Sequence, residues 1–122
     1  WLEVQGSDAA EALRFFADDV LYEDLNFEEP FRGREEVKQF IEDFDIPGIR
    51  FEPERFSEGS TGVCFTWSVK INGVEGTVRG LSFYALGPDG KITYVRDVPE
   101  PAIKPPPLLS VAKAVRPGLS TF

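Results

Sequence analysis

The chain of 122 residues lacks His and Met altogether and has a single Cys, Cys64. The absence of His excludes Ser-His and Cys-His catalytic arrangements, the common zinc sites and the usual pH-sensing side chain. One Cys allows neither an internal disulfide nor a thiolate metal cluster. We therefore expect no metal and no cofactor, and we predict that Cys64 is a small buried apolar residue.

Basic residues are also scarce, since 13 Lys and Arg stand against 21 Asp and Glu and give a net charge of −8. This balance argues against a nucleic-acid-binding protein, which needs a basic face for phosphate. No apolar run approaches the roughly 18 residues of a membrane-spanning helix. Residues 101–122 hold three bases and no acid. The sequence thus predicts an acidic domain over residues 1–101 and a basic, Pro-rich tail over residues 102–122.

Two helices are predicted ahead of a run of strands. Ser7 and Asp8 are good helix-starting residues, and the apolar spacing extends this helix to Ala17. A short strand follows over residues 20–24. The second helix covers residues 34–44, and its apolar face carries Val37, Phe40, Ile41 and Phe44.

From Gly48 onward, apolar and polar residues alternate, which is typical of strands. We expect an antiparallel meander of four strands, and Asn72-Gly73 is a strong signal for a two-residue hairpin turn within it. Gly80 is expected to mark a bend or a bulge. Helices grouped before antiparallel strands predict an α+β fold, in which a long curved sheet wraps over the helices and encloses an apolar, cone-like interior.

Two segments, FFADDVLYED at residues 15–24 and FRGREEV at residues 31–37, resemble the nuclear-transport-factor-2-like superfamily. This superfamily includes ketosteroid isomerases, limonene epoxide hydrolases and SnoaL-like polyketide cyclases. The resemblance continues to about Pro101 and implies the cone-like α+β fold of that superfamily. The first helix is shorter here than the family pattern.

A narrower resemblance joins residues 80–84, 90–92 and 96–105, the last of which read RDVPEPAIKP. These segments are similar to a plant and algal branch whose members are typically targeted to plastids. The resemblance implies a plastid protein, in the stroma or associated with thylakoids. The missing initiator Met fits a removed targeting segment, although an artificial boundary or an incomplete chain also explains it.

Asp24 is the candidate catalytic residue, because the resemblance places it where ketosteroid isomerases keep a general base. The alternative is a solvated acid in an acidic segment. The isomerases also use a Tyr of the first helix and a protonated acid on a later strand. That Tyr would precede this chain, and the later-strand position falls near Gly80 or Ser82, neither of which is an acid. The incomplete set favours a protein that is not an enzyme.

The aromatic residues of the strands can line a pocket for a flat apolar ligand, with one polar group to orient it. The alternative is an ordinary core that faces Leu13, Phe16, Phe40 and Phe44. Arg96 and Asp97 point to opposite faces of their strand, and their alternative role is an ion pair with Glu100 or Asp24. The predicted pocket residues are Tyr22, Phe65, Trp67, Tyr84, Tyr94, Arg96 and Asp97.

The tail is the second candidate region. Its three successive prolines favour an extended polyproline stretch, and residues 108–115 can form two helical turns. Such a segment buries little surface alone, so we expect it to dock on the acidic domain or on a partner. The predicted partner-binding residues are Pro105, Pro106, Pro107, Leu108, Leu109, Val111, Lys113 and Arg116.

Three functions are therefore open. The favoured one is a non-catalytic interaction module, a peripheral subunit or assembly factor of a plastid, photosynthetic complex, which binds other subunits through its sheet face and tail. The second is a binder of a small apolar ligand in the cone. The third is an enzyme like the ketosteroid isomerases or polyketide cyclases that uses Asp24. The sequence also leaves open whether the chain forms a homodimer.

Overall fold

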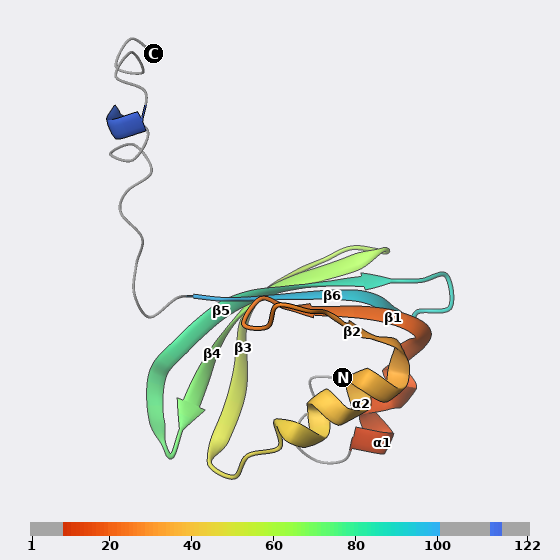
Figure 1. Ribbon diagram of the computed structural model, residues 1–122, viewed down its shortest axis with the longest axis horizontal. Helices are drawn as coiled ribbons and strands as arrows, with labels where there is room; N and C mark the ends of the chain where they lie inside the picture. Colours follow the sequence, from red (N-terminus) through yellow and green to blue (C-terminus); the bar gives the residue numbers. More distant parts are fainter. Residues whose placement is uncertain (1–8, 101–112, 116–122) are drawn as a thin grey trace.

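The computed structural model describes residues 9–100 and 113–115. Two short helical segments lead into a six-stranded curved sheet, with one longer helix inserted after the first two strands (Figure 1). The elements are α1 (Ala9–Ala12), η2 (Leu13–Phe15), β1 (Phe16–Asp24), β2 (Phe31–Arg32), α2 (Gly33–Asp43), β3 (Ile49–Glu58), β4 (Gly62–Ile71), β5 (Val74–Leu86) and β6 (Ile92–Pro99).

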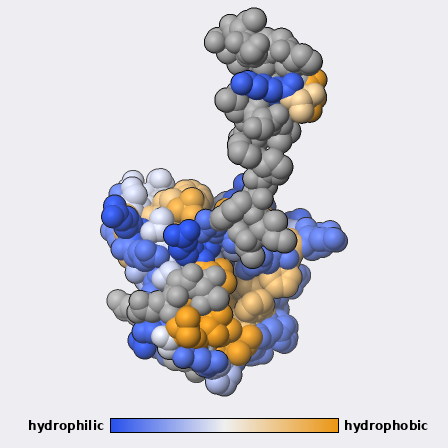
Figure 2. Space-filling model, turned by 90° about the vertical axis from the view of Figure 1, so that its left-hand side faces the viewer, coloured by the Kyte–Doolittle hydropathy of each residue, from blue (hydrophilic) through white to orange (hydrophobic). Residues whose placement is uncertain are grey.

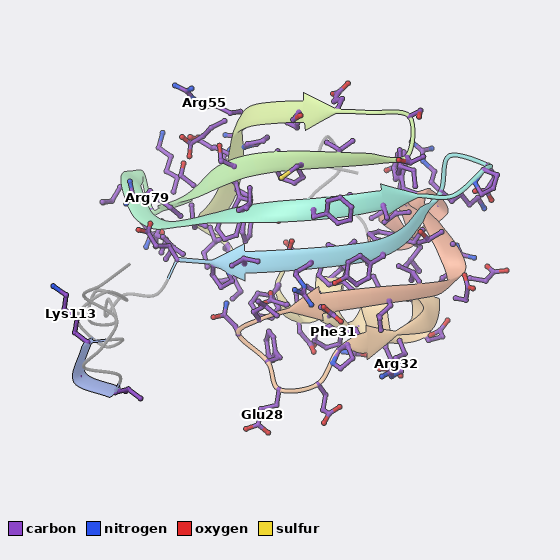
Figure 3. The ribbon with its side chains drawn as sticks, turned by 90° about the horizontal axis from the view of Figure 1, so that it is seen from above. Glu28, Phe31, Arg32, Arg55, Arg79 and Lys113 are labelled. Carbon is purple, nitrogen blue, oxygen red and sulfur yellow. The ribbon has the colours of Figure 1, made fainter. Side chains whose placement is uncertain are left out.

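The sheet has the strand order β2-β1-β6-β5-β4-β3. Strands β3 to β6 form the expected antiparallel meander, and β1 pairs with β6 in parallel. The helices lie inside the curve of the sheet (Figure 1). Seen from above, the sheet runs from Arg55 on the β3 edge to Phe31 and Arg32 on the β2 edge (Figure 3). The predicted α+β cone is thus confirmed.

The predicted first helix is wrong at its end. Helical structure stops at Phe15, and Phe16 and Ala17 already belong to β1. Phe16 is 0% exposed and pairs with Ile92 of β6. Strand pairing and complete burial of this ring therefore prevail over the helical spacing of the segment. The pairing shifts register between Phe16 and Leu21, so Asp18 and Asp19 fall where the ladder is irregular.

The second helix begins one residue before its predicted start. Gly33 has a φ of +78°, and the backbone N–H of Arg32 donates to the side chain of Glu36 at 3.1 Å. This bond satisfies the backbone N–H of the residue just before the helix, which has no partner within the helix. Val37 is completely buried, while Phe44, just after the last helical residue, is 44% exposed. The predicted apolar face is therefore deep in the core at one end and reaches the surface at the other.

Two glycine-containing sites differ in outcome. The hairpin at Asn72-Gly73 forms as predicted, because both residues adopt a positive φ, of 49° and 84°. Of the two alternatives predicted for Gly80, the bulge is wrong, because Gly80 pairs directly with Trp67 on β4, while the bend stays a prediction. A Cβ atom at Gly80 would overlap the indole ring. The glycine provides space for the ring.

Cys64 is half-buried rather than buried. None of the described helices is long and apolar enough to cross a membrane.

Candidate functional site

A cavity of about 440 Å³ lies between α2 and the concave face of the sheet. Pockets of this size accept small organic molecules, and they are usually mostly apolar with a few polar groups. The wall is formed by Tyr22, Asp24, Asn26, Phe40, Ile41, Phe44, Asp45, Ile46, Ile49, Arg50, Phe51, Pro53, Phe65, Trp67, Val69, Ile71, Val78, Ser82, Tyr84, Asp97 and Pro99.

Apolar wall residues extend to the surface of the molecule. Phe44, Ile46 and Val78 all line the cavity and are 44%, 46% and 36% exposed. Figure 2 views the end of the molecule where β3, β4 and β5 curve away, and it shows apolar surface bordered by hydrophilic residues. An apolar ligand can therefore meet apolar side chains on its way into the cavity.

Asp97 on β6 is held by donors from the strands on both sides of it. The Tyr22 hydroxyl on β1 donates to Oδ2 at 2.5 Å, and the Ser82 hydroxyl on β5 donates to Oδ1 at 2.5 Å. Ser82 in turn accepts a hydrogen bond from the indole Nε1–H of Trp67 at 2.9 Å. Both carboxyl oxygens of Asp97 are thus bonded inside a cavity whose wall is mostly aromatic and aliphatic, with Asp24, Asn26, Asp45 and Arg50 as further polar residues.

The environment shifts the titration of this group toward neutral pH. Burial raises the pKa of Asp97 from 3.8 to about 6, the hydrogen bonds from Ser82 and Tyr22 limit the rise, and the charge of Asp24 adds to it. A carboxyl group with a pKa near the working pH can both accept and return a proton. Burial, followed by Tyr84 and Asp97, raises the pKa of Tyr22 well above its ordinary value, so its hydroxyl remains a donor.

Asp24, the predicted catalytic residue, lies on the same wall. It pairs in register with Asp97 on the neighbouring parallel strand. Burial raises the pKa of Asp24, while the backbone N–H of Asn26, at 2.9 Å, opposes this rise. Within the described residues that N–H is the only hydrogen-bond donor to its carboxylate. Asp24 is therefore a second cavity acid, held less firmly than Asp97.

Tyr94 and Arg96 are predicted pocket residues, but the structure places them on the opposite face of the sheet. Both contact Glu23: the Tyr94 hydroxyl donates to it at 2.7 Å, and Arg96 forms an ion pair with it at 2.9 Å. The alternation of side chains along β6 sends Asp97 inward and these two residues outward. The alternative role of Arg96, an ion pair, is observed, but its partner is Glu23. Glu100, one of the two acids expected to pair with Arg96, pairs with Arg79 instead.

The other predicted pocket residues all line the cavity, namely Tyr22, Phe65, Trp67, Tyr84 and Asp97. The four aromatic residues among them also belong to the buried core cluster with Leu13 and Phe16. Pocket and core, which the sequence presents as alternatives, therefore share the same rings: one part of each ring packs and another faces the cavity. Ligand binding by these residues stays a prediction.

Sequence reasoning missed Ser82 as a functional residue. Ser82 itself is not an acid, but its direct cross-strand partner on β6 is Asp97. Pairing residues one by one from the β5–β6 turn would not place Ser82 opposite Asp97. Leu86 pairs with Ile92, whereas Ala85 pairs with Tyr94, so an extra residue in β6 shifts the register.

Most of the predicted partner-binding tail lies outside the described residues, namely Pro105, Pro106, Pro107, Leu108, Leu109, Val111 and Arg116. Lys113 is described and is exposed. In the part of the chain that the structure describes, no group of three or more His, Cys, Asp or Glu residues is arranged to hold a metal ion.

Solved structures share this fold at low sequence identity. A nuclear-transport-factor-2-like protein of unknown function from Cytophaga hutchinsonii is 15% identical with a TM-score of 0.66, over 82% of this chain and 83% of that one. A steroid delta-isomerase from Pseudomonas aeruginosa is 16% identical with a TM-score of 0.64, over 78% and 69%. SalBIII, an epoxide hydrolase/cyclase-like enzyme of pyran ring formation in salinomycin, is 17% identical with a TM-score of 0.66, over 80% and 82%.

No curated protein matches the sequence. A family model does: the SnoaL-like domain matches residues 3–95, which include α1, α2 and all strands up to the middle of β6. The matched range contains most of the cavity wall, although Asp97 follows shortly after it. The chain therefore belongs to the family of SnoaL-like domains.

Proposed function

We propose that the cavity binds a small, mainly apolar ketone and that Asp97 moves a proton between two of its carbon atoms. The observation that carries this proposal is a carboxyl group on an apolar cavity wall, held by Tyr22 and Ser82, whose pKa is raised to about 6. This combination suits a general base that later returns its proton. The favoured function is thus an isomerase or cyclase rather than a non-catalytic module.

In the proposed reaction, Asp97 removes a proton from the carbon next to the carbonyl group. The electron pair moves toward the carbonyl oxygen as an enolate, and Asp97 returns the proton at a more distant carbon. The double bond shifts without any net oxidation. The developing negative charge on oxygen needs a donor. We assign this role to Tyr84, which lines the cavity and hydrogen-bonds with Tyr22, and we propose that its hydroxyl proton turns from Tyr22 to the carbonyl oxygen when the ketone is bound.

The fold supports this assignment by analogy only, because the same architecture carries a steroid delta-isomerase and a cyclase-like enzyme. The chemistry of the cavity wall is the stronger support: aromatic and aliphatic side chains surround the carboxyl groups of Asp24 and Asp97, and Asp45 is a third acid on the wall. Asp97 rather than Asp24 is proposed as the base because side-chain donors fix both of its oxygens.

The experiment is an isomerisation assay with a β,γ-unsaturated steroid ketone, followed through the absorbance of the conjugated product. We expect turnover by the unmodified chain and a loss of at least about 100-fold in kcat for Asp97→Asn. Asp24→Asn is expected to lose less, about 10-fold or below. Tyr84→Phe should lower kcat with little change in KM, because its donor acts mainly in the transition state.

The matched control is Glu23→Gln, which removes a carboxylate beside Asp24 in the sequence but on the outer face of the sheet. Its kcat should equal that of the unmodified chain. Full activity in Asp97→Asn would rule out the proposed base. Absence of both turnover and binding of the ketone by the unmodified chain would rule out this substrate class.

The interaction module with a plastid location stays a prediction. It depends on the tail, of which only residues 113–115 are described, and on the narrower resemblance of residues 80–84, 90–92 and 96–105. A pull-down from plastid extract with the full chain, and with a chain ending at Pro101, tests it. Loss of a partner with the tail would support the module, and no partner for either chain would contradict it.

A further inference from the structure

Trp67 is connected to Asp97 through a single side chain, Ser82. The indole Nε1–H lies 2.9 Å from Ser82 Oγ, and Ser82 Oγ lies 2.5 Å from Asp97 Oδ1. Ser82 is 2% exposed and Trp67 is 7% exposed, so solvent competes little for either bond. Trp67, Ser82 and Asp97 thus form a series of two hydrogen bonds, and the three neighbouring strands β4, β5 and β6 each supply one of these residues.

The donors and acceptors available to each side chain decide the direction of both hydrogen bonds in this series. An indole N–H is a donor only, whereas a Ser hydroxyl has one proton to donate and lone pairs that accept. The contact between Trp67 and Ser82 therefore requires Ser82 to accept. The single hydroxyl proton of Ser82 is left for Asp97. Because a hydroxyl that accepts a hydrogen bond becomes a better donor, the indole strengthens the bond to the carboxylate.

The position of the indole depends on Gly80. Gly80 and Trp67 are direct cross-strand partners, and a Cβ atom at Gly80 would overlap Cζ2 of the ring and lie 2.5 Å from Cη2. Any other residue at this position must push the ring away from its present place. The absence of a side chain on β5 thus allows the hydrogen bond to Ser82 two residues further along the same strand.

We infer that Trp67 is a positioning residue for Asp97, acting through Ser82, and that Gly80 is required for this role. The three residues hold Asp97 in the orientation and the ionised form that a general base needs. Tyr22 provides the corresponding donor on the opposite oxygen. The inference rests on the proposed role of Asp97 as the base, but the arrangement itself is testable without any substrate.

The test is a pH titration of the carboxyl carbon of Asp97 by nuclear magnetic resonance, on the full chain. Trp67→Phe keeps an aromatic ring but removes the N–H. We expect its Asp97 midpoint to rise by about half a pH unit or more, because the carboxylate loses donor strength. Ser82→Ala should raise the midpoint at least as much. The double variant should match Ser82→Ala, because both changes interrupt one series.

Phe51→Leu is the matched control for packing. Phe51 contacts the Trp67 ring edge-on, with centroids 5.5 Å apart, but has no polar group. Its Asp97 midpoint should stay at the value of the unmodified chain. An equal shift in Phe51→Leu, or an unchanged midpoint in Trp67→Phe, would overturn the inference. So would a double variant whose shift is the sum of the two single shifts.

Gly80→Ala, whose Cβ atom would displace the indole ring, should raise the Asp97 midpoint as Trp67→Phe does. The unmodified chain gives an independent measurement if either variant fails to fold. The Trp67 indole N–H resonance should move with the Asp97 midpoint, and this movement should vanish in Ser82→Ala. An indole resonance that is insensitive to the Asp97 titration would overturn the inference. If the midpoints shift as expected but the steroid ketone is neither bound nor turned over, the proposed substrate class fails while the positioning role stands.

Discussion

The raised pKa of the Asp97 carboxyl group weakens the folded state at neutral pH. The pKa of Asp97 is about 6 in the folded chain, above its ordinary 3.8. Between these values the folded chain retains a proton that the unfolded chain releases. The free energy of unfolding therefore falls as the pH rises through this window, by at most about 3 kcal/mol at roughly 1.36 kcal/mol per pH unit.

The residue-scale prediction is that Asp97→Asn stabilises the protein while removing the proposed base. An Asn oxygen can accept from Tyr22, but its NH₂ group then faces Ser82, whose buried hydroxyl proton loses its acceptor and cancels part of the gain. We expect the free energy of unfolding at pH 8 to rise by about 1–2 kcal/mol, with the gain disappearing near pH 4. Urea unfolding at both pH values measures this. A variant less stable than the unmodified chain at pH 8 would contradict it.

Glu23 gives the opposite sign and serves as the comparison. Hydrogen bonds from Tyr94 and Arg96 lower the pKa of Glu23. Its contribution to stability is therefore present above its ordinary pKa and is lost as the pH falls through its folded value. Glu23→Gln should reduce stability at pH 8, where Asp97→Asn increases it.

At the scale of elements, turn residues and helix faces are predictable, because local chemistry decides them. The Asn72-Gly73 hairpin and the apolar face of α2 are examples. The end of the first helix is not, since Phe16 fits a helical spacing as well as a strand, and only pairing with Ile92 decides between them. Alternation along β6 places Tyr94 and Arg96 on one face of the sheet and Asp97 on the other. Which of these faces lines the cavity depends on one extra residue in β6, and no local pattern marks that residue.

A glycine pair tests the turn energetics. Gly73 has a φ of +84°, and a Cβ atom at this position would meet no other atom within 4 Å, so Gly73→Ala changes backbone strain alone. We expect it to lower the free energy of unfolding by about 1 kcal/mol.

Gly59→Ala is the control, because a Cβ atom there would have its nearest neighbour at an ordinary 3.8 Å and its φ is not positive. Its stability should change by less than about 0.5 kcal/mol. Equal losses in both variants, measured by urea unfolding, would contradict this account.

At the scale of the whole molecule, the described core lies within the acidic domain. Its buried apolar residues run from Ala12 to Val95. We therefore expect a chain ending at Pro101 to fold with a Tm within about 2–4 °C of the full chain, the equivalent of less than about 1 kcal/mol. Thermal unfolding by circular dichroism measures this. A larger loss would show that residues 102–122 pack on the domain.

The parallel pairing of β1 with β6 has a consequence for the order of folding. The bond between Tyr22 and Asp97 joins residues 75 positions apart, and loop closure over such a separation is slow. The β3–β6 meander can form from neighbouring hairpins, but β1 can join it only after β6 exists. We therefore expect Asp97 to gain its Ser82 donor before its Tyr22 donor. The bond between Tyr22 and Asp97 should form late, and during refolding we expect it to appear after the sheet structure of the meander.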